Sequence, residues 1–188
     1  MSFAPLTGDA LAAASAPLTM PPEVEGEGVH LTQFRERHFD RLAQMHGDPA
    51  TMRFMGGHME RDEAWRGMAR MVGQWELRGY GIYAVEDDNG VFVGRCGIFH
   101  PLDWPERELG YCIHPDARGK GYATAAALAV RDAARGEGLR RLISLINPQN
   151  TASLRVAERL GTQPADAGHV PDGPVVRHLH DMTPLTRH

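Results

Sequence analysis

The sequence is short of several features that mark particular classes of protein. It has two cysteines in 188 residues, too few for a disulfide framework or, by themselves, for a four-ligand zinc site. No apolar run approaches the ~20 residues of a membrane-spanning helix, and the N-terminus lacks the basic and apolar regions of a signal peptide. A net charge of −4 argues against a dedicated nucleic-acid-binding protein. We therefore expect a reduced, cytoplasmic setting without membrane or nucleic-acid partners.

Lysine is the scarcest charged residue. Lys120 is the only lysine among the 20 basic residues, and the other 19 are arginines. The arginine excess fits a chain rich in Ala and Gly and carries no functional weight. Ten histidines form no His-Glu-x-x-His or comparable cluster. His178 and His180 would share one face of a strand, but two ligands are a weak metal signal, and we expect no metal.

The composition divides the chain into an arm and one domain. Residues 1–23 are rich in Ala, Pro, Ser and Thr without a sustained period, which predicts a flexible N-terminal arm. Because no repeat or second shift in composition follows, residues 24–188 are expected to form a single domain. The sequence leaves monomer and homodimer open.

Hydrophobic periodicity predicts strands and helices in mixed order. Period-two alternation indicates a strand over 29–34, and i, i+3, i+4, i+7 spacing indicates a helix over 62–78 with Trp65 and Trp75 in the core. The Pro-, Gly- and Asp-rich segment 163–173 leaves the last strands open. Further strands are expected over 80–86, 91–99, 108–114 and 139–146, and further helices at 39–43, 122–135 and 151–160.

Residues 108–146 show the order strand, glycine-bearing turn, helix, strand. A connection of this length predicts a parallel pair with a right-handed crossover, whereas the short turns before it predict antiparallel pairing. The predicted fold is therefore mixed α/β (α+β): a central, mostly antiparallel sheet with one parallel β-α-β crossover, flanked by helices.

The turn at residues 118–123, Arg-Gly-Lys-Gly-Tyr-Ala, is the candidate binding motif. Free amides and the dipole at a helix start suit a phosphate or pyrophosphate, although the same glycines also suit a plain connecting turn. A Walker loop requires Ser or Thr after its lysine, and here Gly121 follows Lys120. A dinucleotide fingerprint requires an acidic residue about 20 positions on, where residues 147–150 read Asn-Pro-Gln-Asn instead.

At these residues the chain resembles the GNAT family of acyl-CoA-dependent N-acetyltransferases, in its RimJ/RimL-type branch. The family's pyrophosphate motif, [QR]-x-x-G-x-[GA], is met by Arg118, Gly121 and Ala123. The matches extend from about residue 29 to residue 161. Further matching segments are Asp48-Pro49, Met52-Arg53-Phe54-Met55, Gly94-Arg95-Cys96-Gly97, Glu108-Leu109-Gly110-Tyr111, Asn150-Thr151-Ala152-Ser153 and Leu160-Gly161.

The resemblance implies an enzyme that moves an acetyl group from acetyl-CoA directly to a primary amine, on a protein N-terminus or a small molecule. The co-substrate would lie between the splayed ends of strands 108–114 and 139–146. A bulge in the first strand would point an amide at the thioester oxygen. The residues expected to contact acetyl-CoA are Cys112, Ile113 and His114 in the strand, Arg118, Gly119, Lys120, Gly121, Tyr122 and Ala123 in the turn, and Asn150 and Ser153.

Glu108 is the expected general base, because the attacking amine must lose a proton; the alternative is a carboxylate paired with an arginine. Ser153 is the expected proton donor to the sulfur, with Tyr111 as a second candidate. Cys112 is expected to be a buried small hydrophobe. Thr162 stands where relatives commonly have Phe, which leaves the acceptor unspecified. A non-catalytic CoA-binding module and another nucleotide-binding domain stay open as alternatives.

Overall fold

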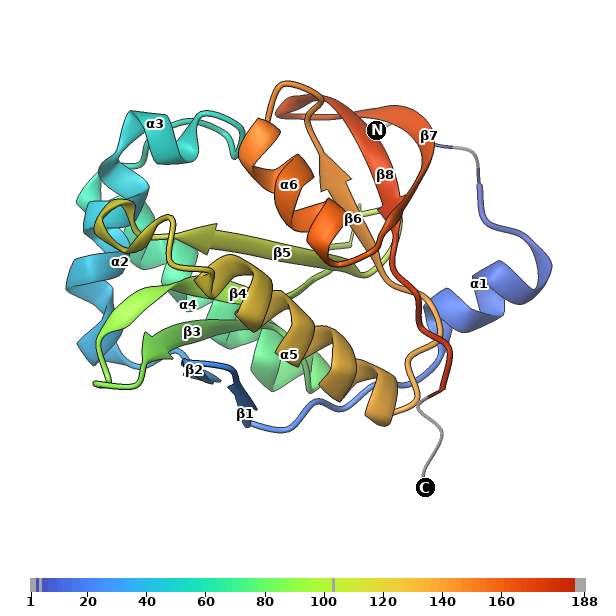
Figure 1. The fold of residues 1–188 in the computed structure, drawn as a ribbon, viewed down its shortest axis with the longest axis horizontal. Helices are drawn as coiled ribbons and strands as arrows, with labels where there is room; N and C mark the ends of the chain where they lie inside the picture. Colours follow the sequence, from blue (N-terminus) through green and yellow to red (C-terminus); the bar gives the residue numbers. More distant parts are fainter. Residues whose placement is uncertain (1–2, 4, 103, 185–188) are drawn as a thin grey trace.

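The computed structural model describes residues 3, 5–102 and 104–184. Eight strands form one sheet with helices on both faces (Figure 1). The helices are α1 (Gly8–Ser15), α2 (Phe39–Gly47), α3 (Pro49–Met52), α4 (Arg61–Arg78), α5 (Tyr122–Gly136) and α6 (Thr151–Arg159), with 3-10 turns at Glu36–His38 and Pro115–Ala117. The strands are β1 (Glu23–Gly26), β2 (Val29–Gln33), β3 (Ile82–Asp87), β4 (Phe92–Phe99), β5 (Glu108–Ile113), β6 (Ile143–Ile146), β7 (Gln163–Val170) and β8 (Gly173–Leu179).

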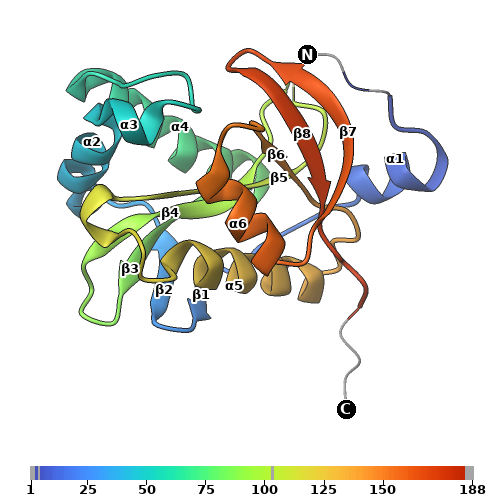
Figure 2. The same cartoon turned by 45° about the horizontal axis from the view of Figure 1, so that its top comes forward.

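The strand order β1-β2-β3-β4-β5-β6-β8-β7 confirms the predicted mixed sheet. All neighbours pair antiparallel except β5 and β6, which are parallel and connected through α5. The 163–173 segment, left open by the sequence, contains β7 and the turn that leads into β8. These two strands extend the sheet beyond β6 (Figure 2).

The two faces of the sheet bury different helices. On one face, alanines of α5 such as Ala126 and Ala127 pack against Leu31, Tyr83 and Leu109, which their small side chains permit at close range. On the other face, Leu42 and Met45 of α2 and Met68 of α4 pack against Ile82 and Cys112. Because helices pack on both faces of the sheet, β5, which lies inside the sheet, is held firmly in place.

The helix α4 forms where its periodicity predicts it, and its C-terminus is closed by Gly79 in the left-handed conformation (φ +72°). The expectation that both tryptophans are core residues is wrong for Trp65. Trp75 is buried, whereas Trp65 is 44% exposed and packs edge-on against Phe39, with 4.9 Å between ring centroids. Near its start, α4 therefore places Trp65 against α2 at the surface rather than in the core.

The N-terminal segment contains a short helix and two residues that reach the core, and its flexibility stays a prediction. Residues 8–15 form α1, and Leu18 and Met20, which follow it, are buried in the core beneath α5. The backbone bond from Met20 N to Gly79 O, 2.8 Å long, holds the segment to the end of α4. Independent folding of residues 24–188 stays a prediction. Within the described part of the chain, no helix is long and apolar enough to cross a membrane.

Candidate active site

The parallel strands β5 and β6 separate almost as soon as they meet. Their only paired position is Glu108↔Ile143, where Ile143 N donates to Arg107 O at 3.1 Å. One residue later, the Ser144 hydroxyl donates to Leu109 O at 2.7 Å, so a side chain takes the place of a sheet bond. The strands therefore open into a gap whose closed end is at Glu108.

Glu108 lies in this closed end, with both carboxylate oxygens held by N–H donors. Leu145 N donates to Oε1 at 3.2 Å, and the Trp104 indole Nε1 donates to Oε2 at 2.6 Å. No arginine forms an ion pair with Glu108 within the described residues. The alternative, in which Glu108 pairs with an arginine, is therefore not observed. Each oxygen keeps a further lone pair that can accept a proton.

Desolvation in the closed end of the gap raises the pKa of Glu108 to about 7. The two N–H donors and the Arg95 charge act in the opposite direction, and the Asp172 carboxylate adds to the rise. A carboxyl group that titrates near neutral pH can exchange protons with an amine, which an ordinary glutamate does poorly.

The edge of β5 that faces the gap is unpaired beyond Glu108. His114 N donates to Val93 O of β4 at 2.8 Å. The antiparallel register pairs Cys112 with Arg95 of β4, so the backbone groups of Cys112 also point toward β4. Because backbone groups alternate along a strand, Tyr111 and Ile113 point their N–H and C=O groups into the gap. Of the three strand residues expected to pair with the co-substrate, only Ile113 presents its backbone there.

The predicted bulge in this strand is absent. The register between β4 and β5 runs unbroken from Phe99↔Glu108 to Gly94↔Ile113, and the irregularity in this part of the sheet lies instead between Val85 and Glu86 of β3. An amide is turned toward the gap by the parting of β5 and β6, so no bulge is required. Cys112 is buried, as predicted.

The start of α6 brings the other two catalytic candidates together. Asn150 caps the helix, its side-chain oxygen accepting from Ser153 N at 3.1 Å. The Tyr111 hydroxyl donates to Ser153 O at 3.1 Å, and burial raises the pKa of this phenol further. The Ser153 hydroxyl has no recorded partner among the described residues and is partly exposed. A donor with a free hydrogen therefore borders the gap.

The glycine turn leads from β5 into α5 with its amides unused. Within the described chain, none of the backbone N–H groups of residues 119–123 has an acceptor, whereas Thr124 and Ala125 donate to Gly121 O. Gly119 and Gly121 have φ of +78° and +88°, and a Cβ built at either would meet no heavy atom within 4 Å. Lys120 is exposed. The turn is an open cradle of N–H groups at a helix N-terminus, suited to an anion.

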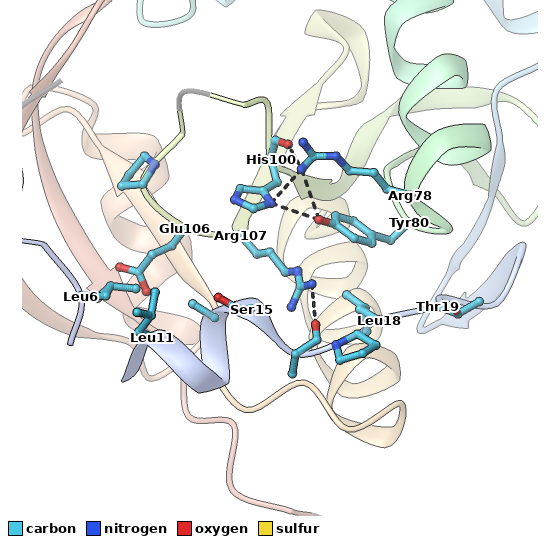
Figure 3. A pocket seen from close by; sticks show the side chains of 14 residues that line it. Leu6, Leu11, Ser15, Leu18, Thr19, Arg78, Tyr80, His100, Glu106 and Arg107 are labelled. Atoms are coloured by element: carbon cyan, nitrogen blue, oxygen red, sulfur yellow. Dashed lines mark hydrogen bonds between the residues drawn. The ribbon is translucent and has the colours of Figure 1, made fainter. Parts of the chain in front are cut away.

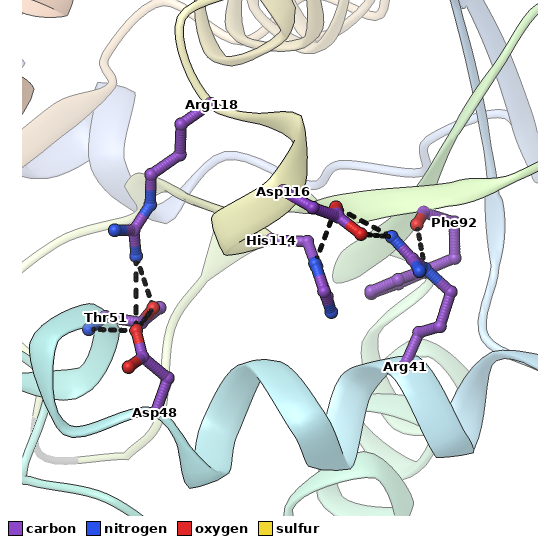
Figure 4. A network of polar contacts seen from close by, with 7 residues as sticks. All are labelled: Arg41, Asp48, Thr51, Phe92, His114, Asp116 and Arg118. Carbon is purple, nitrogen blue, oxygen red and sulfur yellow. Dashed lines mark hydrogen bonds and ion pairs between the residues drawn. The ribbon is translucent and has the colours of Figure 1, made fainter.

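Arg41 of α2 holds the β5 side of this turn (Figure 4). Arg41 donates from Nη2 to both oxygens of Asp116 at 2.9 Å and from Nε to Phe92 O at 2.7 Å. The His114 ring lies 2.7 Å from the same carboxylate. The Arg41 contact is the main reason that the pKa of Asp116 is lowered. His114 therefore enters the site as a support of the turn rather than through a backbone pairing.

Arg118 contacts α3 on the other side of the turn (Figure 4). Its guanidinium donates to the Thr51 hydroxyl and lies 3.6 Å from Asp48 Oδ2. Asp48 also caps α3 by accepting from Thr51 N at 2.9 Å, so one carboxylate joins the helix to the turn. The side chain of Arg118 thus braces the cradle, while the backbone amides that follow it stay open.

Further residues near Glu108 had no site role assigned from the sequence. Arg95 of β4 donates to His46 Nε2 at 3.2 Å and lies near Met55. The loop after α3 approaches the β7–β8 turn, since a Cβ built on Gly56 would lie 3.4 Å from Asp172 Oδ1. No local pattern identifies Arg95 or Asp172 as neighbours of Glu108, because they come from β4 and from the β7–β8 turn, whereas Trp104 lies only four residues before Glu108.

The two histidines considered as metal ligands have other partners. His178 lies 3.2 Å from the Thr162 hydroxyl, and His180 lies 2.9 Å from the Ser144 hydroxyl. Burial lowers the pKa of His180 to about 3, so this ring stays neutral. No group of three His, Cys, Asp or Glu side chains among the described residues is arranged to hold a metal ion.

A comparison with protein-family models identifies one family. The family model described as acetyltransferase (GNAT) domain matches residues 29–163. YkkB of Bacillus subtilis (strain 168) is 33% identical over 123 residues, which are 61% of this chain and 69% of that protein. An acetyltransferase from Agrobacterium tumefaciens str. C58 is 28% identical with a TM-score of 0.77, over 86% of this chain and 95% of that one. The yncA protein of Salmonella typhimurium, solved with its cofactor acetyl-CoA, shares the fold at 18% identity and a TM-score of 0.65, over 86% of this chain and 98% of that one.

Proposed function

The chain belongs to the GNAT acetyltransferase family and is an enzyme of that class, and from this we propose that it transfers an acetyl group from acetyl-CoA directly to a primary amine. The observation that carries the proposal is the gap between β5 and β6, which holds a glutamate with a pKa of about 7 at its closed end. The open N-terminus of α5 lies at its other end. The N-terminus of α5 would bind the phosphates of the co-substrate, and Glu108 would accept the proton that the amine releases.

The residues that line the gap fit acetyl-CoA. The five free amides of residues 119–123 suit its pyrophosphate, and the space beside Gly119 and Gly121 admits phosphate oxygens close to the backbone. The unpaired edge at Tyr111 and Ile113 would pair with the amides of the pantetheine arm, as an added strand does. When bound, acetyl-CoA supplies the activated acetyl group, and the residues around it orient that group.

Proton transfer in the reaction is assigned to Glu108 and Ser153. The amine nitrogen forms a bond to the acetyl carbon while the carbon–sulfur bond breaks, and the surplus amine proton passes to Glu108. The Ser153 hydroxyl supplies the proton that the departing thiolate takes, and solvent restores it. The Tyr111 phenol is the weaker candidate, because its hydrogen is already bonded to Ser153 O. The Tyr111 N–H would stabilise negative charge on the thioester oxygen.

The acceptor is a primary amine of a protein N-terminus or of a small molecule. An α-amino group has an ordinary pKa of about 8 and a lysine-type amine about 10.4, so both arrive largely protonated at neutral pH and both require a base. The ordered motifs between residues 48 and 161 support placement in the RimJ/RimL-type branch. A cytoplasmic location is proposed with the enzyme, as the composition suggests.

Thermal unfolding with four ligands tests the co-substrate. At ~100 times the dissociation constant, a ligand adds about 2.7 kcal/mol to the free energy of unfolding. Acetyl-CoA and CoA should each raise the melting temperature, and NAD and ATP should not. A shift with NAD and none with either CoA compound would remove the basis for acetyl transfer and favour another nucleotide.

Release of free thiol from acetyl-CoA, measured against a panel of primary amines, tests the chemistry. Amine-dependent release supports transfer, whereas CoA binding without release by any amine would indicate a silent binding module. Ser153→Ala should lower kcat and leave the affinity for CoA nearly unchanged. Thr151→Ala, on the exposed side of the same helix turn, is the matched control and should leave kcat unchanged.

A further inference from the structure

A cavity of about 480 Å³ lies between α1 and the segment that enters β5, away from the glycine turn (Figure 3). One wall is apolar and comes from the N-terminal segment, including Leu6, Leu11 and Leu18. The opposite wall is polar and includes Arg78, His100 and Arg107. The volume lies in the range of sites for small organic ligands.

The apolar wall is left uncovered by the protein. Helix α1 buries none of its residues, and Leu11 is 51% exposed although it faces a cavity. A short helix of this composition gains little from its own hydrogen bonds and depends on packing. Its apolar residues therefore have surface available for the hydrophobic part of a ligand.

The polar wall carries positive charge that no carboxylate within the described residues neutralises. Arg107 is 7% exposed, and its Nε and Nη1 atoms are buried without a hydrogen-bond partner. Its Nη2 atom donates to Ala16 O at 2.6 Å, and its guanidinium lies 5.1 Å from the centre of the Tyr80 ring. A buried guanidinium with two unused donors is costly unless an acceptor arrives.

Arg78 adds a second cation to the same wall. It donates to the His100 ring nitrogen at 2.9 Å and lies 3.5 Å from the Tyr80 hydroxyl, both of which are neutral groups. Burial, together with the charges of Arg78 and Arg107, lowers the pKa of His100 to about 4. The histidine thus contributes no charge at neutral pH, and the two arginines set the sign of the wall.

Glu106 also borders the cavity, but it is committed elsewhere. Its carboxylate is bound by Arg141, and Arg177 Nη1 donates to it at 2.8 Å. Its charge is therefore neutralised and does not offset that of Arg107. Of the two arginines on this wall, Arg107 alone has buried donors without an acceptor among the described residues, which suits one carboxylate attached to an apolar body.

From this cavity we propose a binding site for a small monocarboxylate with an apolar chain, held by Arg107 at its carboxylate and by Leu6 and Leu11 along its chain. A guanidinium N–H forms a charge-assisted hydrogen bond with a carboxylate oxygen, and Nε and Nη1 of Arg107 are both buried without an acceptor. The site is separate from the acetyl-transfer site, so it stands or falls independently of the proposed enzyme activity.

The affinities of hexanoate and hexanamide, measured by calorimetry on the full chain, test the proposal. The two compounds share their apolar chain and differ in charge, so hexanoate should bind about tenfold more tightly. Equal affinities, or no detectable hexanoate binding in the millimolar range, would overturn it. Inorganic phosphate should bind less well than hexanoate, and the reverse order would show that the ligand class is wrong.

Variants localise the binding. Leu11→Glu should abolish hexanoate binding, whereas Leu77→Glu, on an 85% exposed position of α4, is the matched control and should leave it unchanged. Arg107→Gln should reduce hexanoate affinity to that of hexanamide. If Arg107→Gln fails to fold, the Leu11 and Leu77 pair still decides the matter, since both side chains are at least half exposed. Unchanged binding in Leu11→Glu would contradict the assignment.

Discussion

Replacing Glu108 by glutamine removes one titrating group and should change the pH dependence of both stability and activity. The side chain keeps its size, but a glutamine offers one oxygen where Leu145 N and Trp104 Nε1 both donate. One N–H donor then loses its acceptor, which lowers the free energy of unfolding by about 1 kcal/mol at every pH. This constant offset is separate from the pH-dependent part.

The sign of the pH-dependent part follows from the raised pKa of Glu108. In the folded protein the carboxyl releases its proton near pH 7, and in the unfolded chain near the ordinary value of 4.5. Over that window the folded state holds more protons, so the stabilising contribution is complete below about pH 4.5 and is lost as the pH rises through about 7. Wild-type stability should therefore fall across this window relative to Glu108→Gln.

The magnitude follows from the size of the shift. A change from 4.5 to about 7 corresponds to ~3 kcal/mol at ~1.4 kcal/mol per pKa unit. Because Glu108 is partly exposed, solvent screening reduces this to about 2 kcal/mol. Between about pH 5 and about pH 8, the variant should gain about 2 kcal/mol on the wild type.

Urea unfolding of both proteins at several pH values measures this difference, since other groups that titrate alike in the two proteins cancel. A difference that stays constant with pH would refute the placement of Glu108 in a desolvated closed end.

In the same pair of proteins, kcat/KM for an amine should rise through about pH 7 in the wild type. The variant should lose that rise and fall by a factor of about 10² to 10⁴. Transfer that is unchanged across pH would show that another group is the base.

Three further outcomes are expected. Trp104→Phe removes a donor to the carboxylate and should move the midpoint of the pH–rate profile upward, because the indole bond lowers the pKa of Glu108; a midpoint that falls would argue against this bond. Asp172→Asn removes a nearby negative charge and should move the same midpoint downward, and an upward shift would contradict the arrangement. Lys120→Ala should weaken CoA binding only a few-fold, whereas Gly121→Val should abolish it. A side chain at φ +88° is strained and would fill the space above the free amides. If both variants had equally mild effects on the CoA-induced shift in melting temperature, the turn would be only a connection.

Local sequence determined most of the secondary structure and the open glycine turn at residues 118–123. The periodicity of residues 62–78 specifies α4, and the alanine-rich run from Tyr122 specifies α5, since both depend on neighbours three or four positions away. The glycines at 119 and 121 allow positive φ by themselves. The order of strand, turn, helix and strand then implies the parallel pair by chain geometry alone. These features depend on few long-range contacts.

Tertiary structure decided what surrounds the reacting groups. The exposure of Trp65, the burial of Leu18 and Met20 and the regular β4–β5 register depend on how distant segments pack, and a pattern along the chain does not contain that information. Glu108 was recognisable as a candidate, but its neighbours Leu145 and Asp172 come from β6 and from the β7–β8 turn, far along the chain. A pKa depends on desolvation and on charges in space. The fold therefore gave this glutamate the proton affinity that its place in the sequence could not specify.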